Sequence, residues 1–535
     1  MDVRTLSTYE SLSPFEIKDF LIKHARETSE KSAASFINAG RGNPNWVATT
    51  PRDGFFLLGQ FAMTESRRVL DLPPGIGGMP KAAGIANRLK DWLAPKSTEP
   101  GASFLLEMLP WSTDKFAFDE DRFVHELVDS IIGDNYPVPD RMLEHNEVIV
   151  HEYLQWAMCG LPRPQGTFKL YAVEGGTAAM CYIFKSLKTN RLLNPGDTIA
   201  LSVPIFTPYL EMPLLEDYGL NVVSIHSLQE DRFQIGDDLD KLLDPAIKAF
   251  FVVNPGNPSA IALSDQTIAR IGAILERRPD LILLTDDVYG TFVPGFRSLL
   301  GAFPRNTIGV YSYSKYFGCT GWRLGVIAVH EDNVFDQLIA DHPEQVSADI
   351  NHRYHALTLE PQNLKFIDRI VADSRDVALN HTAGLSLPQQ VMMSLFSLSE
   401  LMDNKKDYQR TCIGIVKQRV EATIEGLGID IPANPLFDYY YGLIDFEFWM
   451  RKYLDEDVVN WVKDNVHPLD PVFRLAEEHG IVLLNGNGFA APDWSVRISF
   501  ANLPNHVYDD IGRAVRSISR GYREAYEATL PVTVA

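Results

Sequence analysis

The sequence predicts an α/β fold in which a mainly parallel sheet carries helices on both faces. From about residue 165 to about residue 330, apolar runs of strand length alternate with helical patterns, which is typical of parallel sheets with crossover helices. Polar and glycine-containing motifs follow several of these runs directly, and ligands gather at the carboxyl ends of parallel strands. A chain of 535 residues with 45% hydrophobic content can bury the core that such a fold requires.

The expected elements follow one another in a regular order. The predicted strands cover residues 168–173, 198–203, 249–253 and 281–284. Three helical patterns alternate with these strands. The first follows the first strand as far as about Leu187, the second runs from Tyr209 to Tyr218, where Gly219 would end it, and the third covers 264–278. Beyond about residue 400 the sequence predicts a long polar helix over 401–427, shorter strands and a final helix near 506–529.

Composition excludes several classes of protein. The formal net charge of −21 argues against nucleic-acid binding, because phosphate backbones attract basic surfaces. The sequence shows no apolar run of about twenty residues and no signal-peptide pattern at its start. Four widely spaced cysteines without metal-binding spacing predict reduced thiols in a cytoplasmic protein and no metal site: Cys159, Cys181, Cys319 and Cys412.

The stretch from Ser312 to Gly325 places one lysine, Lys315, among hydroxyl side chains, with Arg323 eight residues downstream. A lysine that bonds to a cofactor aldehyde needs a loop from which its amine reaches a flat ring. Hydroxyls and a guanidinium are well suited to a phosphate dianion. For this string alone, a lysine in a surface loop remains the alternative.

Upstream motifs supply complementary chemistry. Asp286 ends an apolar run, and a carboxylate beside a pyridine nitrogen keeps that nitrogen protonated, so that the ring accepts electrons. Gly175, Gly176 and Thr177 open a helix, where backbone amides and the helix dipole attract phosphate. Taken singly, an acid-capped strand end and an ordinary strand-to-helix turn explain the same residues.

These motifs, in this order along the chain, resemble the fold-type I pyridoxal-phosphate enzymes of the aspartate aminotransferase family. The resemblance also rests on segments 38–44, 134–137, 203–206, 254–258 and 494–500. Ser259-Ala260 departs from the Thr-Gly that is usual in the family, which leaves the following turn less certain. The resemblance implies a pyridoxal 5'-phosphate cofactor and a large α/β domain with a smaller α+β domain.

The resemblance also implies a role for each matching residue. Lys315 would carry the cofactor and move the substrate's α proton. The residues implied to bind the cofactor are Asp286 at the ring nitrogen, Tyr289 and Asn257 at the phenolic oxygen, Phe206 on the ring face, and Gly175, Gly176, Thr177, Ser312 and Arg323 at the phosphate. Tyr136 would reach the phosphate of a partner subunit, which implies a homodimer. Arg497 would bind the substrate's α-carboxylate, Asn257 would also contact the substrate, and Gly40 would cover it.

The implied division of the chain has four parts. Residues 1–50 form an N-terminal segment that joins the small domain, 131–395 form the large cofactor-binding domain, and 396–535 form the small domain. Residues 51–130 have no counterpart in the family's common core and are interpreted as an insertion. This insertion exposes leucines and methionines without a core of its own, so it is a candidate for subunit contacts in a larger homo-oligomer.

Within the family, the insertion, the chain length and the stretch 375–390 resemble the aspartate 4-decarboxylases. That resemblance implies loss of the β-carboxylate of L-aspartate to give L-alanine and carbon dioxide, with side aminotransferase activity. The group that holds the side-chain carboxylate is not assigned. Lys115, Arg375 and Arg41 are candidates, and each is alternatively a surface or structural ion pair.

Three alternatives were weighed. An aspartate or alanine aminotransferase with an unusual insertion fits the cofactor motifs equally well. A transcription regulator with an aminotransferase-like domain would need a basic DNA-binding head, for which residues 1–40 are too short and the charge is wrong. An inactive scaffold is disfavoured, because the lysine, the ring aspartate and both arginines are all present.

Overall fold

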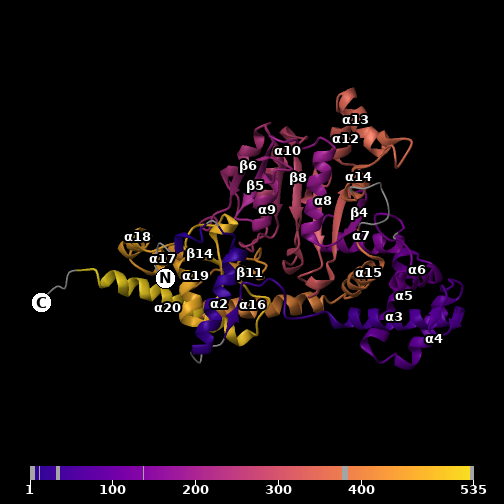
Figure 1. The fold of residues 1–535 in the computed structure, drawn as a ribbon, viewed down its shortest axis with the longest axis horizontal. Helices are drawn as coiled ribbons and strands as arrows, with labels where there is room; N and C mark the ends of the chain where they lie inside the picture. The colour runs from indigo at the N-terminus through magenta and orange to yellow at the C-terminus, as the bar shows by residue number, and fades with distance from the viewer. Residues whose placement is uncertain (1–5, 11, 32–35, 137, 376–383, 531–535) are drawn as a thin grey trace.

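The fold is that of a computed structural model, which describes residues 6–10, 12–31, 36–136, 138–375 and 384–530. A central sheet with its helices lies between two helical regions (Figure 1). One of these regions contains α3 to α6, and the other contains α16 to α20 together with α2. None of the helices in the described ranges is long and apolar enough to cross a membrane.

The central sheet has seven strands in the order β4-β10-β9-β8-β7-β5-β6. Strands β5 to β9 pair in parallel, whereas β10 runs antiparallel to both β4 and β9. The strands are β4 (Phe168–Val173), β5 (Thr198–Val203), β6 (Asn221–His226), β7 (Ile247–Val253), β8 (Ile282–Asp286), β9 (Thr307–Ser312) and β10 (Gly325–His330). The predicted α/β fold with a mainly parallel sheet is therefore confirmed.

Alternate residues of each strand pack on opposite faces of the sheet. Ile199 and Leu201 of β5 lie in one buried cluster, and Ala200 between them lies in another. The first cluster includes residues of α8 (Gly176–Thr189) and α14 (Phe366–Ser374), and the second includes residues of α10 (Asp265–Arg277). The sheet is therefore covered on both faces, which explains why its strands are continuous apolar runs.

Two predicted helices differ from the structure. The pattern at 209–218 forms only α9 (Thr207–Glu211) and a 3-10 turn (Met212–Leu214), because Pro213 lacks the N–H that would continue the helix. The helix predicted over 401–427 is instead α15 (Leu387–Leu401) followed by α16 (Asp407–Leu427). Lys406 separates them in the left-handed conformation, with φ of 54°, which a helix cannot contain.

The C-terminal region combines a small sheet with helices. Strands β11 (Tyr441–Asp445), β14 (Ser495–Ser499) and β13 (Leu484–Asn485) form an antiparallel sheet in that order. The N-terminal helix α2 (Pro14–Lys31) packs on α19 (Asp470–His479), and β1 (Ile37–Asn38) pairs in parallel with β12 (Ile481–Val482). The other helices here are α17 (Phe446–Tyr453), α18 (Glu456–Asn465) and α20 (Tyr508–Glu527).

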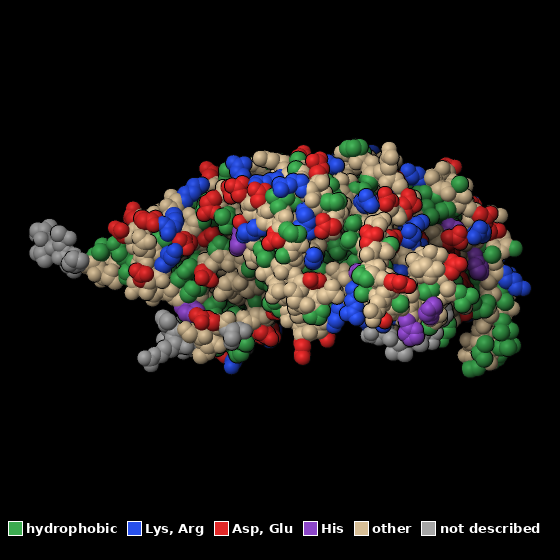
Figure 2. Space-filling model, turned by 90° about the horizontal axis from the view of Figure 1, so that it is seen from above, with side chains coloured by type: hydrophobic (Ala, Val, Ile, Leu, Met, Phe, Trp, Pro, Cys, Tyr) green, Lys and Arg blue, Asp and Glu red, His purple; other side chains and the backbone are tan. Residues whose placement is uncertain are grey.

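The segment predicted to be an insertion is mainly helical. It contains α3 (Thr49–Val69), a hairpin of β2 (Asp71–Leu72) and β3 (Ile76–Gly77), α4 (Ile85–Leu93), α5 (Pro100–Phe116) and α6 (Glu120–Ile132). The expectation that it lacks a core is wrong, because its helices bury a shared apolar cluster that α15 completes. The hairpin exposes Leu70, Leu72, Ile76 and Met79, and hydrophobic side chains gather at one point of the molecule's right-hand end in Figure 2.

The remaining helices connect these regions. Helix α7 (Glu144–Met158) packs against α15 and β4. The others are α11 (Leu299–Ala302), α12 (Val334–Ala340) and α13 (Glu344–Tyr354), with 3-10 turns at Ala94–Lys96, Asp237–Leu243, Gly290–Phe292, Thr320–Trp322, Pro361–Asn363, Asn487–Phe489 and Asn505–Val507.

Candidate active site

A cavity of about 170 Å³ lies where several strands of the large sheet end. Nine of the predicted site residues line it: Gly176, Thr177, Phe206, Asn257, Asp286, Tyr289, Ser312, Lys315 and Arg323. These residues come from segments that span about 150 positions of the chain, and the ends of β8 and β9 supply Asp286 and Ser312. The fold therefore brings together the motifs that the sequence analysis selected.

Lys315 lies in the turn after β9, and its Nζ donates a hydrogen bond to the Gly42 carbonyl at 3.2 Å. The Tyr440 hydroxyl donates to the same carbonyl at 2.8 Å. Gly42 has to be glycine, because an added Cβ would lie 2.2 Å from the Tyr441 hydroxyl and 3.4 Å from Lys315 Nζ. The Lys315 amine and the Tyr441 hydroxyl thus both lie close to Gly42 of the N-terminal segment.

Asp286 ends β8 with a buried carboxylate that none of the described basic side chains pairs with at ion-pair distance. It accepts hydrogen bonds from the Tyr209 hydroxyl at 2.7 Å and from the Val288 amide at 3.3 Å. Burial raises the pKa of Asp286, and these two donors together with Lys315 offset part of the rise. A buried acid of this kind suits a protonated ring nitrogen of pyridoxal phosphate, which would pair with it.

The start of α8 and the Arg323 side chain lie together at one edge of the cavity. Gly175 has a φ of 92°, and an added Cβ would lie 2.5 Å from Arg323 Nη2, so only glycine permits this approach. Arg323 donates to the Thr320 carbonyl at 3.0 Å and to the Glu174 carbonyl at 3.3 Å. Helix N-terminal amides, a guanidinium and the Ser312 and Thr177 hydroxyls are the donor set that a phosphate dianion requires.

Arg497 lies on β14 and is 1% exposed. It donates to the Gly40 carbonyl at 2.8 Å and to Asn257 Oδ1 at 3.3 Å, while its Nε has no hydrogen-bond partner. Its guanidinium carbon lies 4.4 Å from the centre of the Tyr441 ring. Within the described ranges no carboxylate pairs with it. A buried cation without an anion is unfavourable, so the site suits an anionic ligand.

Aromatic side chains enclose the cavity. The Tyr289 ring packs against Tyr440 and Tyr441, with centroids 5.1 Å and 5.4 Å away. Phe206 lies edge-to-face on Tyr209 at 5.3 Å and on Phe15 of α2 at 5.9 Å. These rings give the cavity a partly apolar wall, which strengthens electrostatic interactions within it.

Two tyrosines that the sequence analysis did not select also line the cavity. Tyr209 holds Asp286, and its position three residues after Phe206 was the available signal. Tyr441 lies on β11, under Arg497 and beside Lys315. Burial raises the pKa of Tyr441, but the positive charges of Lys315 and Arg497 outweigh it, so the pKa lies below its ordinary value. No sequence motif identifies this residue.

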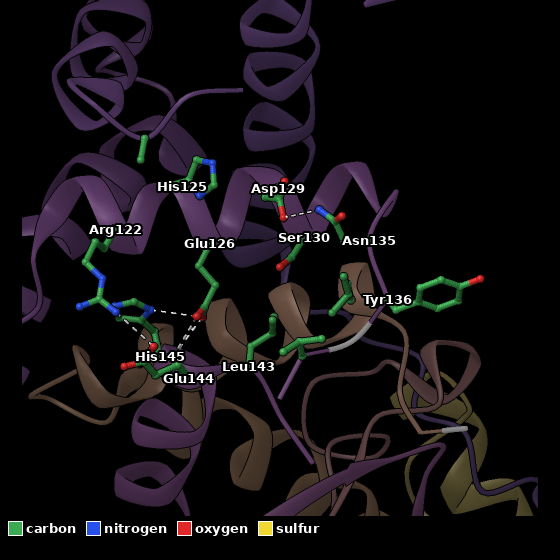
Figure 3. Close-up of a pocket in the computed structure, with 13 residues that line it drawn as sticks. Arg122, His125, Glu126, Asp129, Ser130, Asn135, Tyr136, Leu143, Glu144 and His145 are labelled. Atoms are coloured by element: carbon green, nitrogen blue, oxygen red, sulfur yellow. Dashed lines mark hydrogen bonds and ion pairs between the residues drawn. The ribbon is translucent and has the colours of Figure 1, made fainter. Parts of the chain in front are cut away.

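The remaining predicted residues lie elsewhere. Tyr136 is 70% exposed and borders a separate cavity of about 610 Å³, where it points away from the other labelled side chains (Figure 3). Gly40 contacts Arg497 through its carbonyl. Lys115 pairs with Glu152 at 3.0 Å, and Arg375 is buried and pairs with Asp140 at 3.0 Å, so neither reaches the cavity of this chain.

Arg41, the third candidate for the side-chain carboxylate, is exposed. Of the stretch 375–390 that contributed to the resemblance, the described residues 375 and 384–390 do not line the cavity. Its residues 376–383 lie outside the described residues. Their contribution to the site therefore rests on sequence resemblance alone.

Comparisons with known proteins place this site in context. The family model for aminotransferase class I and II matches residues 173–375. The bifunctional aspartate aminotransferase and L-aspartate beta-decarboxylase of Pseudomonas sp. is 47% identical over 530 residues, covering 98% of this chain and 99% of the relative. The aspartate/prephenate aminotransferase of Nitrosomonas europaea is 31% identical, over 25% of this chain and 35% of the relative.

Solved structures agree on the fold. A double mutant of Thermus thermophilus aspartate aminotransferase superposes with a TM-score of 0.53 at 17% identity, covering 94% of this chain and 96% of that chain. The aromatic aminotransferase of Pyrococcus horikoshii OT3 gives a TM-score of 0.55 at 16% identity, with coverages of 94% and 99%. At these identities the likeness concerns the fold alone.

Proposed function

The chain belongs to the aminotransferase class I and II family, together with the bifunctional aspartate aminotransferase and L-aspartate beta-decarboxylases, and we propose that it carries out both reactions on L-aspartate. It is a pyridoxal-phosphate enzyme. The main product is L-alanine with carbon dioxide, and transamination is the secondary activity. The relative's identity extends across the whole chain, including the helical segment 51–130, so it supports the whole activity and not the cofactor site alone.

The residues in the cavity fit pyridoxal phosphate. Gly176, Thr177, Ser312 and Arg323 would hold its phosphate, and Asp286 would pair with the ring nitrogen. Phe206 would cover one ring face, and Tyr289 and Asn257 would contact the phenolic oxygen. When bound through Lys315, the cofactor supplies a conjugated ring that accepts the electron pair of a bond broken in the substrate.

The chain's own groups would act on the substrate at defined atoms. Arg497 would bind the α-carboxylate of aspartate through its planar fork, which supplies the anion that the buried guanidinium lacks. The Lys315 amine would remove and return the proton at the α carbon. The Gly42 carbonyl, which the Tyr440 hydroxyl fixes, would orient that amine whenever it is free.

The charge distribution around the cavity favours loss of the side-chain carboxylate. Of the described residues that line the cavity, only Lys315 and Arg323 are basic, and both have roles at the cofactor. Arg497 lies just outside this lining, against Asn257 and Tyr441, and would bind the first carboxylate, so the described lining offers no further arginine for a second one. Weak ground-state binding of the departing carboxylate is what β-decarboxylation requires, because firm binding would raise the barrier.

We further propose a homodimer as the minimal unit, assembled into a larger homo-oligomer in the cytoplasm. Tyr136 is exposed and lies outside its own cavity, which suits a side chain that reaches the phosphate of a partner subunit. The exposed apolar hairpin at 70–79 is a candidate for further subunit contacts. We keep the division into 1–50, 51–130, 131–395 and 396–535 as a proposal for the domains.

The single structural observation that carries the proposal is the buried Arg497, which lies against Tyr441 beside Lys315 and has no carboxylate partner among the described residues. The test is to incubate the purified protein with pyridoxal phosphate and L-aspartate, without any oxo acid, and to follow carbon dioxide and alanine. Sustained equimolar release over many turnovers is expected. A halt after about one turnover, relieved only by 2-oxoglutarate, would instead identify an aspartate or alanine aminotransferase.

A further inference from the structure

The backbone that follows Lys315 is held by one short segment far away in the sequence. Three successive carbonyls, those of Tyr316, Phe317 and Gly318, accept hydrogen bonds from residues 46–52. Trp46 Nε1 donates to the Tyr316 carbonyl at 3.1 Å, and the Ala48 amide donates to the Phe317 carbonyl at 3.2 Å. The lysine turn is therefore fixed from outside the large sheet that carries it.

Arg52, in the first turn of α3, makes the strongest of these contacts. Its Nη2 donates to the Gly318 carbonyl at 2.7 Å, and its Nη1 donates to the Phe317 carbonyl at 3.1 Å and to the Ala48 carbonyl at 2.6 Å. The guanidinium carbon lies 5.1 Å from the centre of the Phe396 ring. Among the described residues no carboxylate forms an ion pair with Arg52, so backbone carbonyls and the Phe396 ring face its charge.

Residues 46–52 approach the lysine turn so closely that position 318 has to be glycine. Gly318 has a φ of 59°, and an added Cβ would clash with the Trp46 carbonyl oxygen at 1.9 Å. Tyr408 of α16 closes the other side, because its hydroxyl donates to the Tyr316 carbonyl at 2.9 Å. The Tyr316 carbonyl is therefore held from both sides, and the carbonyls of Phe317 and Gly318 are held by residues 46–52.

We propose that Arg52 is a positioning residue for Lys315, and that the helix that opens the insertion fixes the catalytic lysine in addition to any role in subunit contacts. The proposal rests on the proposed function, in which Lys315 holds the cofactor and moves the α proton. A lysine with both tasks needs an anchored backbone, because only its side chain can then move between the two positions. Such preorganisation of a reacting group lowers the barrier without contributing to substrate binding.

The test compares Arg52→Met and Arg52→Lys with a matched control, Arg88→Met. Methionine keeps the apolar stem of Arg52 but removes its donors, and lysine restores one donor group. Arg88, on α4, bonds Glu65 and the carbonyls of Lys81 and Ala83, and does not touch the lysine turn. Each methionine variant thus loses all the hydrogen bonds of one guanidinium, but those of Arg88 lie within the insertion and those of Arg52 reach the lysine turn.

For Arg52→Met we expect kcat for alanine formation to fall about 10-fold or more, while KM for aspartate stays within about 2-fold. Arg52→Lys should recover part of the loss, and Arg88→Met should retain kcat even if its melting temperature falls as much. The second readout is the pH midpoint of the visible absorbance of the holoenzyme, which reports the cofactor bond to Lys315. That midpoint should shift in Arg52→Met and stay at the wild-type value in Arg88→Met.

Equal loss of kcat in Arg52→Met and Arg88→Met, or a wild-type absorbance midpoint in Arg52→Met, overturns the proposal. If Arg52→Met does not fold, Arg52→Lys decides, and wild-type kcat and midpoint in that variant overturn the proposal as well. Failure of the proposed function has a different signature. Wild-type protein would then release no alanine, while the absorbance comparison would still report on Arg52.

Discussion

Replacing Arg497 with methionine should remove substrate binding at little cost to the fold. The guanidinium is 1% exposed, donates only two hydrogen bonds and has no described carboxylate partner. Substitution leaves two oxygen acceptors without donors, at about 1 to 2 kcal/mol each. It also relieves the burial of an unpaired cation, which costs several kcal/mol. These terms nearly cancel, so we expect the free energy of unfolding to change by about 1 kcal/mol or less.

Arg419 provides a matched control in the same region. It is 4% exposed, and its guanidinium lies over two aromatic rings, as Arg497's does. Its three guanidinium nitrogens, however, all have partners: Asn505 Oδ1 at 2.8 Å, the Phe500 carbonyl at 2.9 Å and Asn45 Oδ1 at 2.9 Å. Arg419→Met leaves three acceptors without donors against two for Arg497→Met, so it should destabilise the protein by about 1 to 2 kcal/mol more than Arg497→Met does.

The effect on kcat/KM for aspartate should have the opposite order, with the larger loss in Arg497→Met. Loss of a buried bidentate pair with the α-carboxylate costs about 3 to 5 kcal/mol, which is about 150-fold to 5000-fold in kcat/KM. Arg419→Met should keep kcat/KM within about 3-fold of the wild type. The assays are urea unfolding without substrate and initial rates of alanine formation. Equal destabilisation by the two variants, or an Arg497→Met enzyme within about 10-fold of wild-type kcat/KM, would refute the reasoning.

Four further predictions concern single side chains. Lys315→Ala should lower both alanine formation and transamination by about 10⁴-fold or more, and retained alanine production measured by chromatography would exclude Lys315 as the essential amine. Tyr209→Phe removes a donor that lowers the pKa of Asp286, so the acidic limb of the kcat/KM pH profile should move to higher pH, and an unmoved limb would contradict that role. Tyr441→Phe keeps the ring under Arg497 and should lower kcat with little change in KM. Tyr441→Leu removes the ring as well and should also raise KM. Identical kinetics of the two variants would show that the hydroxyl and the ring do not act separately. Burial raises the pKa of Glu400 to about 8, so the folded state keeps a proton that the unfolded state releases, and the free energy of unfolding falls as pH rises from about 4.5 to about 8. Glu400→Gln should remove up to about 4 kcal/mol of this loss. Urea unfolding at pH 5.5 and 8.5 checks whether the stability gained by the variant is confined to the higher pH.

The cofactor motifs could be predicted because their chemistry constrains short stretches of sequence. Lys315 needs a turn that presents its amine, and Gly175 needs the positive φ that lets Arg323 approach. The strands were predictable for the same local reason, since a sheet covered on both faces needs continuous apolar runs. Their positions relative to one another follow once the parallel order is known.

Other features depend on contacts that no local pattern records. The core of the insertion was missed because α15 completes it from almost 300 positions away. Tyr441 becomes a cavity residue only because β11 pairs with β14, which sets its ring under Arg497. Arg52 looks like any helix-start arginine until its donors are seen on carbonyls 265 and 266 positions away. Contacts at such separations follow from the assembled fold and not from composition or periodicity.

The charges around the cavity indicate which state of the protein the site is built for. Asp286 and Arg497 are buried, and neither has an oppositely charged partner among the described residues. Each is therefore unfavourable in the ligand-free chain and would be neutralised by a charge from outside, Asp286 by a protonated ring nitrogen and Arg497 by a carboxylate. Because only the folded state offers these partners their sites, the cofactor and a dicarboxylate should each raise the melting temperature. The dicarboxylate's contribution should vanish in Arg497→Met while the cofactor's contribution remains, and loss of both together would mean that the two charges are not separate sites.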